Sequence, residues 1–308
     1  MPVNEPISAQ VTTWQWRGFA IRYQQFGSVG SPLILIHGFG ASSDHWRKNG
    51  PVLATHHRVY AIDLIGFGGS AKPQPLIEMD YTFDTWAAQV LDFAREVVGD
   101  PVVLVGNSIG CIVALQAAVT DPMQVLGVAM LDCSLRQLHD DKRQQLPWFR
   151  RTSTPLIQSV LGNRRVGHFF FKQLARPNVI RSILLEAYGR KQAVTPELLD
   201  LLLKPAQDPG AADVFLAFVR YSQGPLPDIL LPQVNCPVTI GWGDQDPWEP
   251  VALGRELAQA DCVENFTVFA GVGHCPQDEA PELINPWLLD WLSTHDWGSL
   301  RSHCDGSH

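Results

Sequence analysis

The chain has 308 residues, 45% of them hydrophobic, and a formal net charge of −8 at pH 7. This hydrophobic content is ample for a folded core, and the length favours about two domains. The negative charge argues against general binding to nucleic acid. No apolar run reaches the roughly 18 residues that a membrane-spanning helix requires.

The N-terminus and the cysteines favour an intracellular protein that is soluble or bound peripherally to a membrane. Residues 1–16 have no basic segment followed by an apolar one, so we expect no signal peptide. The cysteines lack paired spacing, as is typical of reduced thiols, and they are Cys111, Cys133, Cys236, Cys262, Cys275 and Cys304. Because no cluster of His and Cys has metal-ligand spacing, we expect neither a metal nor a cofactor.

Alternating or apolar strand patterns recur along the chain, with helical stretches between most of them. Residues 12–16 and 19–25 are predicted to form an antiparallel start. Six further strands are predicted to be parallel because helical segments separate them, and they lie at 32–36, 58–62, 102–106, 127–132, 237–242 and 265–269. The pattern predicts an α/β fold with a mostly parallel central sheet flanked by helices.

The turn after the strand at 32–36 is His37-Gly38-Phe39-Gly40. We expect the backbone N–H of Phe39 to be one of two donors to a developing oxyanion. Such a donor typically contributes about 3 kcal/mol to transition-state stabilisation. His37 is predicted to be a structural imidazole bonded to loop carbonyls, and a catalytic role is the alternative.

A second strand-to-helix connection, Gly106-Asn107-Ser108-Ile109-Gly110, follows the apolar residues 101–105 and precedes an Ala-rich helical stretch. Gly-x-Ser-x-Gly in this setting is typical of the nucleophile elbow of an α/β-hydrolase. The glycines allow a strained turn that lifts the Ser108 hydroxyl clear of the sheet. The following helix points its N-terminus at the oxyanion, and the N–H of Ile109 is the second expected donor. The alternative is a Gly-rich turn with an inert serine.

The region between the sixth and seventh strands interrupts this alternation of strands and helices. It is too long for a loop in a compact domain and is rich in Leu, Arg, Ala and Gln. We therefore predict an inserted helical cap at 134–232. The α/β-hydrolase core is then expected at 1–133 and 233–297, followed by a disordered tail at 298–308.

The predicted cap is basic, whereas the rest of the chain is acidic. Residues 134–232 contain 14 Lys and Arg against 8 Asp and Glu, a balance of +6 that leaves −14 elsewhere. Aromatic residues lie among the basic ones, as in Trp148-Phe149-Arg150-Arg151 and the run at 169–171. This pattern suits peripheral contact with an anionic membrane or an amphiphilic substrate with an acidic end. The alternative is an ordinary solvated helix face over an apolar gorge.

One histidine is placed to activate Ser108. His274 follows the strand at 265–269, in a Gly-rich loop that lets the imidazole lean over the elbow. The other nine histidines lie earlier in the chain or in its last turn and tail. A plain surface-loop histidine is the alternative. Cys275 beside it and Cys111 after the elbow are expected to be packing residues.

A catalytic serine also needs an acid, which in this fold stands between the serine and the histidine in chain order. Asp246 is the preferred candidate because it stands three residues after Gly243, at the end of the strand at 237–242. Asp244 is the first alternative and is otherwise a turn residue. Asp132, at the end of the strand at 127–132, is the second alternative.

The whole chain resembles the α/β-hydrolases, and more closely the group of pheophytinases and chlorophyll dephytylases. The wider resemblance rests on the segments at 16–23, 37–40, 60–70 and 106–110. The closer one rests on Asp246-Pro247-Trp248 and on 273–282. It implies an enzyme that cleaves the phytyl ester of a tetrapyrrole. Cys111 departs from the second glycine that many members carry, and Ile-His-Gly-Phe-Gly replaces Val-Pro-Gly-Phe-Gly of the pheophytinases.

The residues together predict a serine hydrolase that cleaves a small lipophilic carboxylic ester through an acyl-enzyme. In it Ser108 is the nucleophile, His274 the base and Asp246 the acid that orients the base, with Phe39 and Ile109 as the oxyanion hole. A serine at position 108 argues against a dehalogenase or an epoxide hydrolase, which would carry Asp there. A carbon–carbon bond hydrolase, a perhydrolase and a non-enzymatic ligand receptor on this fold are the alternatives.

Overall fold

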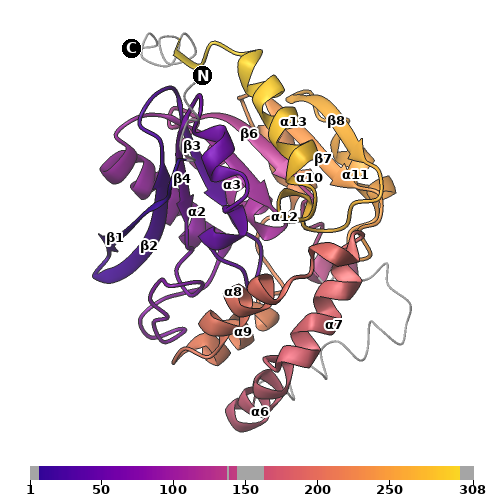
Figure 1. Ribbon diagram of the computed structural model, residues 1–308. Coiled ribbons are helices and arrows are strands. Elements are labelled where there is room, and N and C mark those ends of the chain that lie inside the picture. Colours follow the sequence, from indigo (N-terminus) through magenta and orange to yellow (C-terminus); the bar gives the residue numbers. More distant parts are fainter. Residues whose placement is uncertain (1–6, 137–138, 144–162, 299–308) are drawn as a thin grey trace.

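The computed structural model describes residues 7–136, 139–143 and 163–298, which form a central sheet with helices on both faces (Figure 1). The strands run in the order β1-β2-β4-β3-β5-β6-β7-β8. β2 pairs antiparallel with β1 and β4, and the remaining neighbours are parallel. Their bounds are β1 Gln10–Trp16, β2 Phe19–Phe26, β3 Pro32–Ile36, β4 Arg58–Ile62, β5 Val102–Asn107, β6 Val125–Leu131, β7 Val238–Gly243 and β8 Val263–Phe269. The antiparallel start and the parallel remainder were both predicted from the sequence.

The helices outside the insert cover the two faces of this sheet. They are η1 Ser43–Trp46, α1 Gly50–Leu53, α2 Phe83–Phe93, η2 Ala94–Val98, α3 Ile109–Thr120, α11 Val251–Leu257, α12 Pro276–Glu279 and α13 Pro281–Ser293. α2 and α3 lie against one face, where their apolar residues join one core cluster. α1 and α13 contribute to the cluster on the other face.

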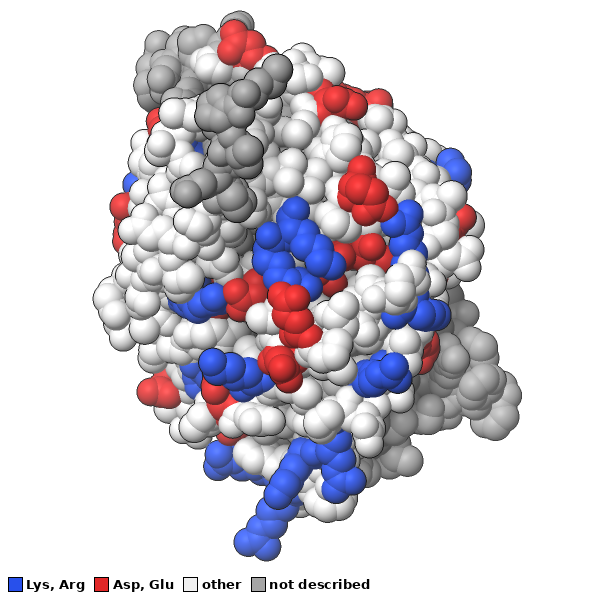
Figure 2. Space-filling model, in the orientation of Figure 1, with Lys and Arg blue, Asp and Glu red and all other residues white. Residues whose placement is uncertain are grey.

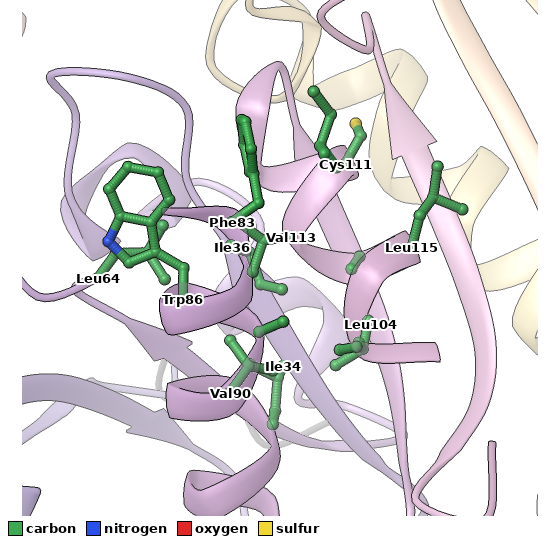
Figure 3. Packing of buried hydrophobic residues seen from close by; sticks show 14 of the residues in the cluster. Ile34, Ile36, Leu64, Phe83, Trp86, Val90, Leu104, Cys111, Val113 and Leu115 are labelled. Atoms are coloured by element: carbon green, nitrogen blue, oxygen red, sulfur yellow. The ribbon is translucent and has the colours of Figure 1, made fainter. Parts of the chain in front are cut away.

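Successive residues of β3 show how the strands divide between these clusters. Ile34 and Ile36 pack with α2 and α3, whereas Leu33 and Leu35 pack toward α1 and α13, and all four are fully buried. Figure 3 shows Ile34 and Ile36 among side chains of both helices, including Trp86. Full burial of one such aliphatic side chain contributes about 1.5–3 kcal/mol. The sheet is therefore a rigid support for the loops at the carboxyl ends of its parallel strands.

A helical insert follows β6, as the sequence predicted. It contains α4 Asp140–Arg143, α6 Arg164–Leu174, α7 Pro177–Ala187, η3 Lys191–Ala193, α8 Pro196–Ala206, α9 Ala211–Arg220, α10 Pro227–Leu230 and η4 Leu231–Gln233. In Figure 1, α6 to α9 lie at the lower end of the molecule, below the sheet. The aromatic and basic residues at 148–151 and most of the predicted disordered tail lie outside the described residues.

None of the helices in the described ranges combines the length and the apolar character that crossing a membrane requires.

Candidate active site

Ser108 stands at the sharp turn between β5 and α3, with φ 57° and ψ −120°, a conformation that side-chain-bearing residues rarely adopt. Gly106 and Gly110 make room for this turn. A Cβ on Gly106 would lie 2.5 Å from the Cys111 nitrogen, and one on Gly110 would lie 2.4 Å from the Ile36 carbonyl oxygen. Neither position accepts a side chain, which explains the Gly-x-Ser-x-Gly spacing.

Three side chains from three different loops form a continuous hydrogen-bonded chain. His274 Nε2 lies 3.0 Å from Ser108 Oγ, and His274 Nδ1 lies 2.7 Å from Asp246 Oδ2. An ionised carboxylate only accepts hydrogen bonds, so Nδ1 carries the proton and Nε2 accepts from the serine hydroxyl. All three side chains belong to buried residues. The structure thus brings together the three residues that the sequence selected.

The loop after β7 fixes the orientation of the Asp246 carboxylate. Asp246 Oδ1 accepts hydrogen bonds from the N–H groups of Trp248 at 2.9 Å and Glu249 at 3.1 Å. Oδ2 is thereby left facing His274. The Trp248 ring stands edge-on to the imidazole, with 4.9 Å between ring centroids. These contacts restrict the plane of the imidazole as well as its tautomer.

Neither alternative acid is hydrogen-bonded to His274 in the described part of the chain. Asp244 Oδ1 accepts from the Gly271 N–H at 2.7 Å, a local turn contact of the kind expected for it. Asp132 is fully buried after β6, and its Oδ1 accepts from the Gly243 N–H at 2.9 Å. Burial, together with the nearby negative charge of Asp246, raises the pKa of Asp132 well above its ordinary value. The rise in pKa disfavours the charged form of Asp132.

Two backbone N–H groups beside Ser108 have no partner among the described residues, and they belong to Phe39 and Ile109. Ile109 is the first residue of α3, so its N–H lies at the positive end of that helix. Gly38 allows the Phe39 turn to approach, since a Cβ at Gly38 would lie 3.1 Å from the Ser108 Cβ. Free donors of this kind are what an oxyanion hole requires.

His37 supports this turn and does not contact Ser108. Its Nε2 accepts a hydrogen bond from the Leu64 N–H at 3.1 Å, so its Nδ1 carries the proton and lies 2.7 Å from the Gly38 carbonyl oxygen. Burial lowers the pKa of His37 below its ordinary value, which keeps the ring neutral. The structural role predicted for His37 agrees with these contacts.

A cavity of about 1000 Å³ lies over Ser108, between the core loops and the insert. The walls from α6 to α9 are apolar and include Phe171, Leu174, Ile180, Ile183, Leu202 and Phe215. Polar residues of the insert line another part of the cavity, and they are Ser134, Arg136, His139, Tyr221 and Ser222. Phe218 of α9 stacks on Phe39, with 4.5 Å between ring centroids. Small-molecule sites typically enclose about 300–1000 Å³. The cavity therefore has room for a long apolar group next to the serine.

Glu249 is a carboxyl group on the cavity wall that sequence reasoning missed. Its Oε1 accepts a hydrogen bond from Ser134 Oγ at 3.3 Å, and the residue is only 8% exposed. Burial raises the pKa of Glu249 to about 7, against an opposing contribution from His274. The available signal was its position, three residues after Asp246 in the same loop.

A buried hydrogen-bonded chain ties the insert to the core beside the cavity. His45 Nε2 lies 3.0 Å from the Tyr188 hydroxyl, which donates to Asp278 Oδ2 at 3.0 Å. Burial lowers the pKa of His45 to about 4, so the ring is neutral at pH 7. Asp278 also pairs with Arg47 at 2.7 Å and with Lys48 at 3.1 Å. Sequence reasoning missed this chain because nothing in the local sequence links positions so far apart.

The end of α7 contacts the loop that carries His274. The Ala187 carbonyl accepts a hydrogen bond from the His274 N–H at 2.9 Å. A Cβ on Gly273 would lie 2.1 Å from the same carbonyl oxygen, so only glycine allows this approach. The Glu279 carboxylate accepts from the N–H groups of Gly273 and Arg190 and holds the two loops together. The insert therefore helps to position the imidazole.

The chemistry available at this site is attack by a hydroxyl, with an imidazole as base and two backbone donors for the resulting oxyanion. Cys275 also lines the cavity, but burial raises the pKa of its thiol well above the ordinary value, which disfavours the reactive thiolate. Within the described residues, no three His, Cys, Asp or Glu side chains are grouped as metal ligands.

A sequence model of the alpha/beta hydrolase family matches residues 33–287. The chain belongs to this family. The fold agrees, since the structure of the epoxide hydrolase CorEH superposes with a TM-score of 0.77 and 20% identity, over 93% of this chain and 99% of that one. At this identity the likeness concerns the fold alone, and it confirms the predicted α/β-hydrolase fold.

Two curated relatives cover most of the chain. The chloroplastic pheophytinase of Arabidopsis thaliana is 25% identical, over 97% of this chain and 70% of that protein. The uncharacterized hydrolase YugF of Bacillus subtilis (strain 168) is 27% identical, over 89% of this chain and 95% of that protein. Other matches include a methyl ester esterase and a 2-hydroxy-6-oxo-2,4-heptadienoate hydrolase. The family likeness therefore indicates a hydrolase and leaves the type of bond open.

Proposed function

We propose that this protein hydrolyses the carboxylic ester of a lipophilic substrate through an acyl-enzyme on Ser108. The observation that carries the proposal is the hydrogen-bonded chain from Ser108 through His274 to Asp246 at the floor of an apolar cavity. His274 takes the proton from the Ser108 hydroxyl, whose oxygen attacks the ester carbonyl carbon. Asp246 keeps the imidazole in the required tautomer and stabilises its positive charge.

The carbonyl oxygen becomes negatively charged, and the free N–H groups of Phe39 and Ile109 stabilise it by donating hydrogen bonds to it. The tetrahedral intermediate expels the alcohol, which takes the proton from His274 and leaves an acyl group on Ser108. Water attacks this acyl-enzyme with His274 again as base, and the acid product and free serine are formed. His274 passes the proton of the water to Ser108 Oγ, so serine and neutral imidazole are regenerated, while the original serine proton leaves with the alcohol.

A long hydrocarbon group is the substrate feature that the cavity favours most. Each buried CH₂ contributes about 0.8 kcal/mol, and the walls from α6 to α9 are apolar. The phytyl ester of a chlorophyll-type tetrapyrrole is the specific substrate we propose. Its support is the similarity to a pheophytinase over 97% of this chain at 25% identity.

The test is a rate profile of the purified protein on p-nitrophenyl esters of increasing acyl chain length, with phytylated tetrapyrroles measured alongside. We expect kcat/KM to rise with chain length by orders of magnitude over the acetyl ester, and phytol to be released from the tetrapyrrole. Good hydrolysis of long esters without release of phytol would restrict the proposal to another lipophilic ester. No turnover of any ester would contradict it.

A hydrolase of a carbon–carbon bond is the second candidate. It is supported by the 25% identity to a 2-hydroxy-6-oxo-2,4-heptadienoate hydrolase over 87% of this chain. The same base and oxyanion donors could act on a ketone whose leaving group is carbon. Loss of the dienoate chromophore of such a substrate, at a rate above that of any ester, would favour this reaction over ester hydrolysis.

A further inference from the structure

Helix α6 leaves large apolar side chains in solvent. Phe169 is 67% exposed, and Phe170 and Val166 are each 43% exposed. Residues three or four positions apart lie on the same side of a helix, so Val166, Phe169 and Phe170 form one outward face. Phe171 and Leu174 of the same helix line the cavity instead. An exposed apolar face of this kind marks a contact with a partner or a membrane.

The chain around this face is strongly basic, although the protein as a whole carries −8. Residues 163–185 contain no Asp or Glu, and their basic residues are Arg164, Arg165, Lys172, Arg176 and Arg181. Arg164 pairs with Asp213 at 3.2 Å. The other four form no ion pair with any residue in the described ranges. Figure 2 shows blue side chains and no red ones at the lower tip, where Figure 1 places α6.

We propose that the outward face of α6 docks on an anionic lipid bilayer. Val166, Phe169 and Phe170 would enter the boundary between headgroups and acyl chains, while Arg165 and Lys172 contact anionic headgroups. A second copy of the chain is a poor occupant, because two such basic faces would repel each other across a twofold axis. This docking surface goes beyond the hydrolase proposal, since binding to lipid requires no turnover.

The docking surface on α6 lies next to the cavity, which gives membrane binding a function. α6 stands between the docking surface and the cavity, and its Phe170 and Phe171 rings lie 6.5 and 5.2 Å from the ring of Phe215, measured between centroids. Phe215 and Phe171 are cavity-lining residues. A lipophilic molecule dissolved in the bilayer would therefore need only a short path along apolar side chains to reach Ser108.

The experiment is co-flotation of the full chain with phosphatidylcholine vesicles that do or do not contain phosphatidylglycerol. We expect binding to the anionic vesicles at low salt, little binding to the neutral ones, and a decrease as salt rises. Arg165→Glu with Lys172→Glu should weaken binding about thirtyfold or more, since each basic residue contributes about fivefold. Phe169→Ser should weaken it about tenfold.

Matched controls separate lipid contact from damage to the fold. Val29 is 62% exposed in the turn before β3, outside α6 and at the amino end of that strand, so Val29→Ser should bind vesicles like the wild type. Ser108→Ala should also bind normally, which keeps this test independent of the hydrolase proposal. All variants except Ser108→Ala should keep the wild-type rate on a short water-soluble ester.

Three results would overturn the docking surface. The first is no binding to anionic vesicles at low ionic strength, and the second is equal binding to neutral vesicles. The third is a dimer in sedimentation that Phe169→Ser converts to a monomer, because the apolar face would then be covered by a second copy.

Discussion

The loops at the carboxyl edge of the sheet and the helical insert build the two halves of the cavity in different ways. On the core side, Asp246 uses both carboxylate oxygens, and the orientation of His274 is fixed by hydrogen bonds at 2.7 and 3.0 Å. On the insert side, the part of the wall that comes from α6 to α9 consists of apolar side chains, whose contacts are non-directional. The insert makes polar contacts with the core at Ala187 and Tyr188, and also through the pairs Arg47–Glu197, Lys72–Asp208 and Ser134–Glu249.

This difference indicates that the core side positions the reacting groups and that the apolar wall of the insert selects the substrate. Hydrogen bonds fix the distance and angle that proton transfer needs, whereas apolar contacts are non-directional and depend on area. Substitutions on the core side should therefore change the rate for every ester. Substitutions in the insert should change the preference among esters.

The largest expected effect comes from the nucleophile. Ser108→Ala should lower kcat by about 10⁴-fold or more on every ester, because no other group can form the acyl-enzyme. Ser134→Ala is the matched control, since Ser134 also lines the cavity and should keep most of the activity. Steady-state rates on a short and a long p-nitrophenyl ester test this. Full activity in Ser108→Ala would show that Ser108 is not the nucleophile, and the core side would then not have the catalytic role assigned to it.

The second largest effect separates the two neighbouring carboxyl groups. Asp246→Asn should lower kcat by a factor approaching 10⁴ with little change in KM, because the imidazole loses the carboxylate that selects its tautomer. Asp132→Asn should be much milder, since Asp132 accepts a hydrogen bond from the Gly243 N–H and makes none with His274 in the described part of the chain. If Asp132→Asn has the large effect and Asp246→Asn the small one, the catalytic acid is Asp132 after β6, and Asp246 after β7 has a structural role.

The three residues of the hydrogen-bonded chain on the core side were predictable from the sequence, whereas Glu249 and the contacts of the insert were not. Ser108 lies in a local pattern whose glycines have a steric reason, and Asp246 and His274 follow apolar strands that the sequence marks clearly. The contacts of Glu249 and Tyr188 depend on segments far away in the chain, so no local pattern reveals them. The insert was predicted only as mainly helical, because its cavity wall has no motif.

The third effect concerns stability and follows from the buried Glu249. The pKa of the Glu249 carboxyl group is about 7 in the folded state and 4.5 in the unfolded chain. Between these two pH values the folded state therefore binds a proton that the unfolded chain has released. The free energy of unfolding should therefore fall as pH rises from 4.5 to 7, by about 3 kcal/mol, and stay lower above 7. Glu249→Gln has no titrating group at this position, so its free energy of unfolding should lack this decrease between pH 4.5 and 7.

Urea unfolding at several pH values checks this, with Glu197→Gln as the control because the Glu197 side chain is 68% exposed. Glu249→Gln should match the wild type at low pH and exceed its stability at neutral and alkaline pH. A gap between the two proteins that does not change with pH would contradict the assigned titration.

The smallest expected effect comes from the apolar wall of the insert and concerns the preference for long-chain esters. Ile183→Ser introduces a hydroxyl into the apolar wall, so kcat/KM for a long-chain ester should fall about tenfold while that for the acetyl ester stays constant. Val29→Ser, on an exposed turn away from the cavity, should change neither rate. An equal loss on both esters would show that the wall also positions the reacting groups.

The most direct test of the central claim is mass analysis of the protein after rapid mixing with a long-chain p-nitrophenyl ester and acid quenching. We predict a burst of p-nitrophenol and an added mass equal to one acyl group, located by peptide mapping on Ser108. The adduct should persist longer in Asp246→Asn, where deacylation is slow. An acyl group on any other residue, or rapid hydrolysis by wild type and Asp246→Asn with no adduct in either, would contradict the account.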